Sequence, residues 1–179
     1  DIVNALLNQE LIDINKAETN YGATPLYIAC SEGHTDIVNA LLSQESIDVN
    51  QATMNNGKTP LYVACLNHYT DIVNALLKQE SIDINKSRTD NGLTPLLISC
   101  YKGHTDIVNA LLSQESIDIN KATTDIGATP FLVACQFGNL KVMKLLKSNK
   151  ADIFCTESGG TDENNDDVGA SAIFYAAYG

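Results

Sequence analysis

The sequence predicts an all-α solenoid of stacked helix-turn-helix units joined by hairpin-like loops, with about five repeats when partial ones are counted. One segment that opens with glycine occurs four times, at residues 22–30, 57–65, 92–100 and 127–135. A second segment, Thr-Asp-Ile-Val-Asn-Ala-Leu-Leu, is repeated without change at residues 35–42, 70–77 and 105–112. Both return after 35 residues. A period of this length is typical of repeats that stack along one axis.

We interpret residues 1–179 as a single domain divided by these repeats. A partial repeat at 1–21 precedes full repeats at 22–56, 57–91, 92–126 and 127–168, and a partial repeat follows at 169–179. The last full repeat departs from the period because of an acidic insertion at about 156–168, which we expect to be mobile. Because the chain begins and stops within a repeat, we expect it to be a fragment of a longer protein.

Each repeat should contain a short first helix, seen most plainly at Pro25–Glu32. We expect Thr24 to cap the first free N–H groups, with Pro25 at the first helical position, where its missing N–H has no cost. Gly33 should end the helix, because glycine readily adopts the left-handed conformation of a helix C-cap.

A second helix is expected from Thr35 to about Ser43. Thr35 is predicted to be its N-cap, with the Asp36 carboxylate in the first turn at the positive end of the helix dipole. Apolar residues cover a wide face between Ile37 and Leu42. This helix should therefore pack on both flanks.

The segment after the second helix alternates apolar and polar residues at Ile47 and Val49 and ends in Asn56-Gly57, a dipeptide typical of tight turns. We expect an extended arm followed by a hairpin-like turn. Helices of about eight residues are too short to be stable alone in water. Each repeat should therefore depend on its neighbours.

The pattern Gly-x-Thr-Pro-Leu opens the repeats at residues 22–26, 57–61 and 92–96, and Gly-His follows the first helix at 33–34 and 103–104. A fourth copy opens at residues 127–131, and a degenerate fifth without Thr-Pro at 169–174. Across nearly the whole chain these motifs resemble the ankyrin repeat. The repeats are two residues longer than the usual length of about 33. Residues 54, 97 and 132 lack the usual Asp and His, and Tyr27 and Tyr62 stand at that His position.

Four cysteines occupy the same position of successive repeats: Cys30, Cys65, Cys100 and Cys135. Equivalent helices of neighbouring repeats should stand about 8–10 Å apart, which is too far for a disulfide between them. We expect small buried thiols in a reducing compartment, the cytoplasm or the nucleus. Cys155 lies outside this register and is predicted to be a loop thiol.

The formal net charge is −11 and the pI about 4.5. This acidity argues against nucleic acid and anionic membrane surfaces as partners, because each is itself negative, and favours a neutral or basic protein or peptide. No apolar run is long enough to cross a membrane, and the start lacks the features of a signal peptide. We therefore expect a cytoplasmic protein. The sequence leaves the oligomeric state open.

The sequence contains only incomplete motifs for metal binding or catalysis. The pairs Cys30–His34, Cys65–His68 and Cys100–His104 each offer two ligands where a zinc site needs four, and no third group orients them for nucleophilic catalysis. The spacing Asp162-x-Asn164-x-Asp166 resembles a calcium loop but lacks the glycine and the bidentate glutamate that should follow. No phosphate-binding loop or hydrolase motif is present. We predict no enzymatic activity, no metal and no cofactor.

The repeats differ most at positions beside the turn glycine and at the end of the first helix. The resemblance implies that such positions line the concave surface and the finger tips, where partners of ankyrin-like proteins usually bind. Exposed aromatic residues beside polar groups are also typical of interface hot spots. The predicted partner-binding residues are Tyr21, Ala23, Glu32, Asn56, Lys58, Leu66, Asn67, Asn91, Leu93, Tyr101, Lys102, Ile126, Gln136 and Phe137.

The first hypothesis for function is therefore a non-enzymatic module that binds a protein or peptide on its concave face and finger tips. Two alternatives stay open: a structural spacer or scaffold arm between other domains, and a substrate-recruiting segment of a larger enzyme. Divergence between repeats at the concave positions favours binding over a spacer. Repeated acidic residues, among them Glu45 and Asp48, form a strip that could steer a basic partner.

Overall fold

The structure, a computed structural model, describes residues 12–153 of the chain. The first helices of its repeats are α2 (Pro25–Glu32), α4 (Pro60–Leu66), α6 (Pro95–Lys102) and α8 (Pro130–Gln136). The second helices are α3 (Thr35–Leu42), α5 (Thr70–Leu76), α7 (Thr105–Leu112) and α9 (Leu140–Ser148). Residues 12–153 contain no strand. The predicted all-α solenoid of helix-turn-helix units is confirmed.

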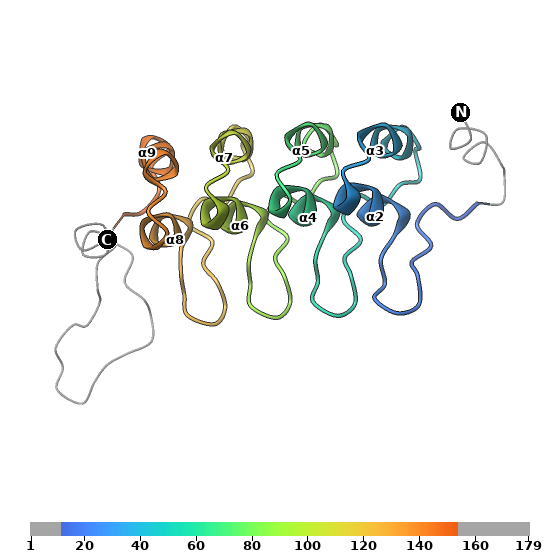
Figure 1. Ribbon diagram of the computed structural model, residues 1–179, viewed down its shortest axis with the longest axis horizontal. Helices are drawn as coiled ribbons and strands as arrows, with labels where there is room; N and C mark the ends of the chain where they lie inside the picture. The colour runs from blue at the N-terminus through green and yellow to red at the C-terminus, as the bar shows by residue number, and fades with distance from the viewer. Residues whose placement is uncertain (1–11, 154–179) are drawn as a thin grey trace.

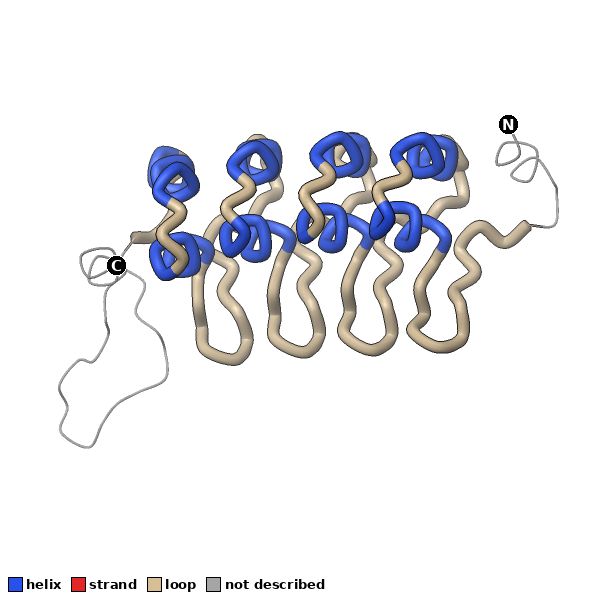
Figure 2. Tube along the Cα trace, in the orientation of Figure 1, coloured by secondary structure: helices blue, strands red, loops and turns tan. Residues whose placement is uncertain are grey.

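The helices form two rows, with the first helices in one and the second helices in the other (Figure 1). Each helix contacts its equivalent in the next repeat as well as its partner in its own repeat. Long loops project from the row of first helices, on the side away from the second helices (Figure 2). Contacts therefore run between adjacent repeats, as expected for a structure that grows along one axis.

The predicted first helix is confirmed at both ends. The backbone N–H of Tyr27 donates to Thr24 Oγ1 over 3.1 Å, and Pro25 is the first helical residue. Gly33 lies in the left-handed region, at φ 77°. A β-carbon there would lie 2.8 Å from the ring of Tyr69 in the next repeat, so glycine serves both the turn and the stacking.

The prediction that Thr35 caps the second helix is wrong. Thr35 is the first helical residue, the N-cap position belongs to His34, and no side chain there makes a capping bond. The connection is a tight turn in which the Thr35 N–H donates to the Gly33 carbonyl over 3.0 Å. In the equivalent turn of the third repeat, the Thr105 hydroxyl donates back to the Gly103 carbonyl. The Thr35 backbone and the Thr105 hydroxyl therefore support the turn, whereas the Thr70 hydroxyl of the second repeat donates to Asp106 Oδ2.

Apolar side chains from both rows form one continuous core. Leu76 and Leu111, equivalent residues of α5 and α7, are fully buried. The cysteines at residues 30, 65, 100 and 135 are buried, as predicted. Cys155, the acidic insertion and the last partial repeat lie outside the described residues.

A ladder of asparagine side chains joins successive repeats beside the second helices. The Asn85 side chain donates to the Ser116 carbonyl over 2.7 Å and accepts from the Asp118 N–H over 2.9 Å. Asn50 makes the same two bonds one repeat earlier, and Asn15 makes them two repeats earlier. Each asparagine thus satisfies two backbone groups of the following repeat.

The hairpin-like turns form what we call finger tips, at residues 18–23, 53–58, 88–93 and 123–128. In each, the first residue's N–H donates to the carbonyl of the sixth, as from Thr53 to Lys58 over 3.0 Å. One backbone hydrogen bond joins each tip to the next, for example from the Thr124 N–H to the Asn91 carbonyl over 3.0 Å. The tips therefore form a connected row that holds their side chains in fixed register.

Candidate functional site

The side chains predicted to bind a partner lie at two places in the repeats. The finger tips carry Tyr21, Ala23, Asn56, Lys58, Asn91, Leu93 and Ile126. The ends of the first helices carry Glu32, Leu66, Asn67, Tyr101, Lys102, Gln136 and Phe137. Four of the larger ones, Tyr21, Tyr101, Ile126 and Phe137, are 61%, 42%, 52% and 47% exposed. Large apolar side chains this exposed are available for contact with a partner.

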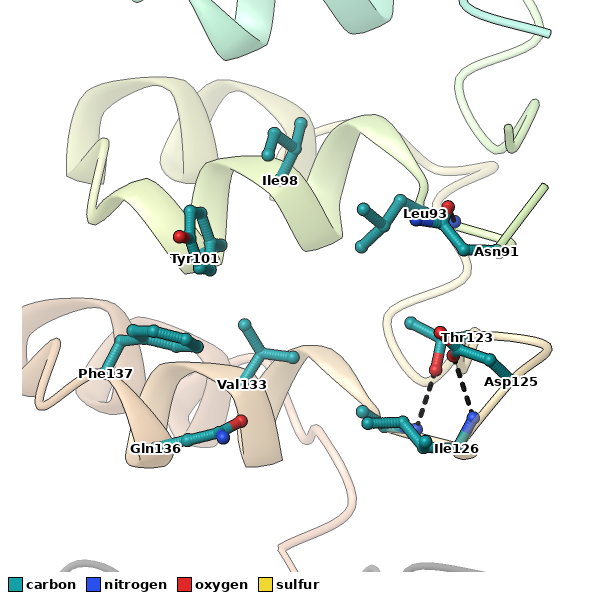
Figure 3. A pocket seen from close by; sticks show the side chains of 11 residues that line it. Asn91, Leu93, Ile98, Tyr101, Thr123, Asp125, Ile126, Val133, Gln136 and Phe137 are labelled. Atoms are coloured by element: carbon teal, nitrogen blue, oxygen red, sulfur yellow. Dashed lines mark hydrogen bonds between the residues drawn. The ribbon is translucent and has the colours of Figure 1, made fainter. Parts of the chain in front are cut away.

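Six of these residues come together between the third and fourth repeats, in a groove of about 220 Å³. We call it the aromatic groove (Figure 3). Its predicted members are Asn91, Leu93, Tyr101, Ile126, Gln136 and Phe137. Its other lining residues are Ile98, Thr123, Asp125, Ala128 and Val133. The groove runs from the ends of α6 and α8 to the finger tips.

One end of the groove is aromatic. Tyr101 and Phe137 face each other edge to face, with ring centroids 4.4 Å apart and ring planes at 70°. Such a pair is a favourable arrangement for aromatic rings. The Lys102 amine lies 5.5 Å from the Tyr101 ring centroid. This end therefore offers apolar surface with a cation beside it.

The finger end of the groove is held by short polar contacts. The Leu93 N–H donates to Asn91 Oδ1 over 3.1 Å, and the Ile126 N–H donates to Asp125 Oδ1 over 2.8 Å. A hydrogen bond from Thr123 and that from Ile126 hold the pKa of Asp125 below its ordinary value. Asp125 is therefore ionised at neutral pH. Backbone and side chains here are fixed before any partner binds, which reduces the entropy lost on binding.

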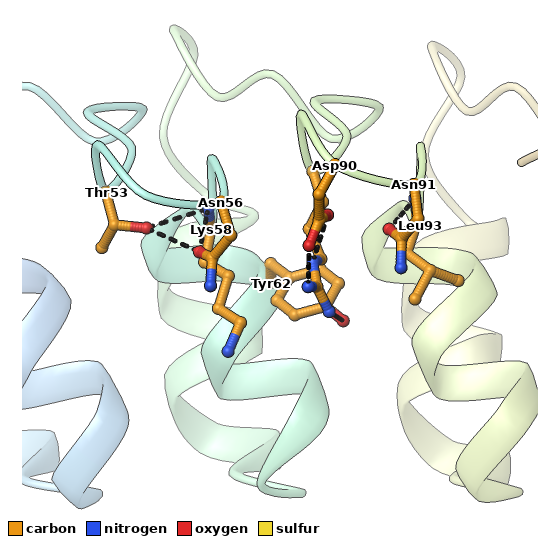
Figure 4. Close-up of polar contacts among 8 residues, drawn as sticks. Thr53, Asn56, Lys58, Tyr62, Asp90, Asn91 and Leu93 are labelled. Carbon is orange, nitrogen blue, oxygen red and sulfur yellow. Dashed lines mark hydrogen bonds and ion pairs between the residues drawn. The ribbon is translucent and has the colours of Figure 1, made fainter. Parts of the chain in front are cut away.

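The neighbouring surface, between the second and third repeats, is polar (Figure 4). Arg88 pairs with Asp90 and donates to Tyr62 Oη over 3.5 Å, and its guanidinium carbon lies 5.8 Å from the Tyr62 ring centroid. Lys58 stands at the position of Leu93 in the next repeat. The two adjacent surfaces therefore share a backbone and differ in chemistry.

The other predicted residues are not part of the groove. The Asn67 side chain donates to the Ser31 carbonyl over 2.9 Å, which ties the second repeat to the first. Leu66 is partly buried against the core, and Ala23 is half-buried in its tip. Tyr21 and Glu32 are exposed on the first repeat.

Comparing the repeats with one another did not identify five of the residues that line the groove. Ile98 and Val133 were overlooked because their position is apolar in every repeat, which indicates packing rather than binding. Asp125 and Thr123 were missed because their role depends on the Arg88–Asp90 pair of the preceding tip, which the sequence alone does not reveal. Ala128 holds a variable position and is buried.

Two of the histidines considered as metal ligands, His68 and His104, lie at a junction between the second and third repeats. The His68 and His104 rings stack with centroids 3.9 Å apart, and His68 Nε2 lies 2.8 Å from Asp106 Oδ1. Burial, and then the neighbouring His68, lower the pKa of His104. Burial raises the pKa of Asp106, but hydrogen bonds from Thr70 and His68 outweigh the effect of burial. The pKa is lowered to about 2.

These groups do not form a metal centre: among residues 12–153, no three His, Cys, Asp or Glu side chains are arranged to hold an ion. Burial raises the pKa of Cys30 and of Cys65 to about 12. Thiols in this state are poor nucleophiles and poor metal ligands at neutral pH. No helix in the described part of the chain has the length and apolar character needed to cross a bilayer.

A family model described as ankyrin repeats (3 copies) matches residues 1–88 and 80–157. A search of curated proteins found no match. Ankyrin repeats are generally protein–protein interaction modules and are typically without enzymatic activity.

Proposed function

Because the chain belongs to the ankyrin repeat family, we propose that it is a non-enzymatic module that binds a protein or peptide, with the aromatic groove as its contact surface. One observation carries the proposal. Six of the residues singled out by differences between the repeats line a single hollow. Tyr101 and Phe137 are half-exposed there, on a backbone that is already fixed. Exposed aromatic side chains in a preformed hollow are typical of binding hot spots.

The contrast between the repeats favours binding over a spacer. A spacer needs the core and the asparagine ladder, and it gains nothing from exposed apolar groups. Tyr101 corresponds to Ser31 in the first repeat, and Phe137 corresponds to Glu32. Placing aromatic rings at two positions that accept polar residues elsewhere adds exposed apolar surface, which favours association.

The test is capture of partners from an extract of the source cell by immobilised protein, read by quantitative mass spectrometry. The groove variant combines Tyr101→Ala with Phe137→Ala. A matched control combines Met54→Ala with Leu140→Ala, which removes two exposed apolar side chains outside the groove. We expect the control to retain capture and the groove variant to lose it, with helicity and melting temperature preserved in both. Equal capture by both variants would contradict the proposal.

A further inference from the structure

Asp125 places a negative charge at the finger end of an otherwise apolar groove. Its side chain is exposed and lines the hollow. The Ile126 N–H and the Thr123 hydroxyl both donate to it, which keeps it ionised and holds it in one orientation. An oriented carboxylate beside apolar surface is a favourable contact for a cationic group of a partner.

The preceding finger tip shows which kind of group neutralises a carboxylate at this position. Asp90 is the equivalent residue, and Arg88, two residues earlier, neutralises it within the same tip. The fourth repeat has Thr123 at the position of Arg88. Within residues 12–153 the ion pairs are Arg88–Asp90 and His68–Asp106, so Asp125 has no cationic partner there.

A positive charge lies beside the opposite, aromatic end of the groove. The Lys102 amine lies beside the aromatic pair, 5.5 Å from the Tyr101 ring centroid. A basic residue bound at that end would meet a like charge, whereas one bound at the finger end would meet Asp125. The groove thus distinguishes its two ends by charge, which fixes the direction in which a charged ligand can lie.

We propose that the aromatic groove binds a peptide segment carrying one large apolar side chain and, on one side of it only, a lysine or arginine that pairs with Asp125. The apolar side chain contacts Tyr101, Phe137 and Val133, and the basic residue lies towards the fourth finger tip. This proposal rests on the proposed function, because it names the chemistry of the partner for the same groove. Charge complementarity selects this ligand over an acidic peptide.

The first experiment selects ligands from a random twelve-residue peptide library displayed on phage, with the folded protein immobilised. We expect the enriched peptides to share a large apolar residue followed or preceded, at one fixed spacing, by lysine or arginine. Enrichment of peptides with an apolar residue and no basic residue at a fixed spacing would overturn the proposal.

The second experiment measures the Kd of enriched peptides by fluorescence polarisation with two charge variants. Asp125→Asn keeps the acceptor oxygen for Ile126 and Thr123, and Asn20 and Asn55 show that a finger tip accepts asparagine at this position. Asp118→Asn is the matched control, because it removes one exposed charge outside the groove and keeps the acceptor for the Asn120 N–H. We expect Asp125→Asn to raise Kd about threefold to tenfold, and Asp118→Asn to leave it within about twofold.

Failure of this proposal can be told apart from failure of the proposed function. If peptides lose binding in the Tyr101→Ala and Phe137→Ala variant but bind equally to wild type and Asp125→Asn, the groove binds peptides and the basic partner is wrong. If binding persists in the double alanine variant, both proposals fail. A selection repeated on Asp125→Lys should enrich acidic residues where the wild type enriched basic ones, and an unchanged preference would also overturn the inference.

Discussion

Two adjacent surfaces on the same side of the solenoid show how one scaffold can carry different chemistry. Between the second and third repeats, the Arg88–Asp90 pair covers the buried Tyr62, and the surface is polar and internally neutralised. Between the third and fourth, the same backbone carries the Tyr101–Phe137 pair and the unneutralised Asp125. The difference lies in exposed or partly exposed side chains outside the core. A repeat protein can therefore change its binding surface without changing its core.

If the two surfaces lie on the same scaffold, truncating equivalent core side chains beneath them should lower the free energy of unfolding equally. Leu76→Ala and Leu111→Ala each remove a fully buried side chain at equivalent positions of α5 and α7. Each should lower the free energy of unfolding by about 2–5 kcal/mol and loosen the neighbouring repeats. Urea denaturation followed by circular dichroism measures both. A cost below about 0.5 kcal/mol, or costs that differ severalfold, would contradict a shared core.

The asparagine ladder should contribute less than the core and should act between repeats. Asn85→Ala removes two hydrogen bonds and leaves the Ser116 carbonyl and the Asp118 N–H without that partner. The expected loss is about 1–3 kcal/mol in the free energy of unfolding. Asn109→Ala, at an exposed helical position, is the control and should stay within about 0.5 kcal/mol. Equal effects of the two substitutions would rule out a role for the ladder in stability.

The Arg88–Asp90 pair should matter for surface chemistry more than for stability. Both partners are partly exposed, and solvent screens such pairs. Arg88→Thr, which gives the third finger tip the residue of the fourth, should cost about 1 kcal/mol or less in thermal or urea unfolding. A loss above about 2 kcal/mol would show that the polar surface is part of the scaffold and would weaken the comparison.

The smallest expected effect is a pH dependence of stability, and it arises from His104 at the junction between the second and third repeats. Burial and His68 lower the pKa of His104 in the folded protein, so below about 6.5 the unfolded chain binds more protons at this residue. The contribution of His104 to stability is therefore lost as the pH falls through and below 6.5. His104→Asn, which takes the residue of the fourth repeat at Asn139, should reduce this loss between pH 7.5 and 5.5. An identical pH profile in the variant would contradict the assignment.

Much of the scaffold could be predicted because its signals are local. Thr24, Pro25 and Gly33 each act within a single turn of helix, and their roles follow from their own conformational preferences. The role predicted for Thr35 was wrong because the tight turn at Gly33 places His34 at the N-cap position and Thr35 inside the helix. The contacts of Asn85 with Ser116 and Asp118 could not be foreseen, because they depend on the register between two repeats.

The groove was predictable only in part, for the same reason. Tyr101, Phe137, Leu93 and Ile126 differ from their equivalents in other repeats, and that difference pointed to them. Which of the variable residues meet depends on how neighbouring repeats stack, so Tyr21 and Glu32 could not be separated from the groove residues in advance. The significance of Asp125 depends on a missing partner, and a missing arginine becomes visible only once Arg88 is seen bound to Asp90.

The most direct test of the comparison is site-specific photo-crosslinking of a bound peptide. Benzoylphenylalanine in place of Phe137 puts the probe in the aromatic groove, and the same residue in place of Glu32 puts it at the equivalent position of the first repeat. With the tightest-binding peptide of the library, we predict crosslinking from position 137 and none from position 32. Equal crosslinking from both positions, or crosslinking from position 32 alone, would contradict a groove confined to the third and fourth repeats.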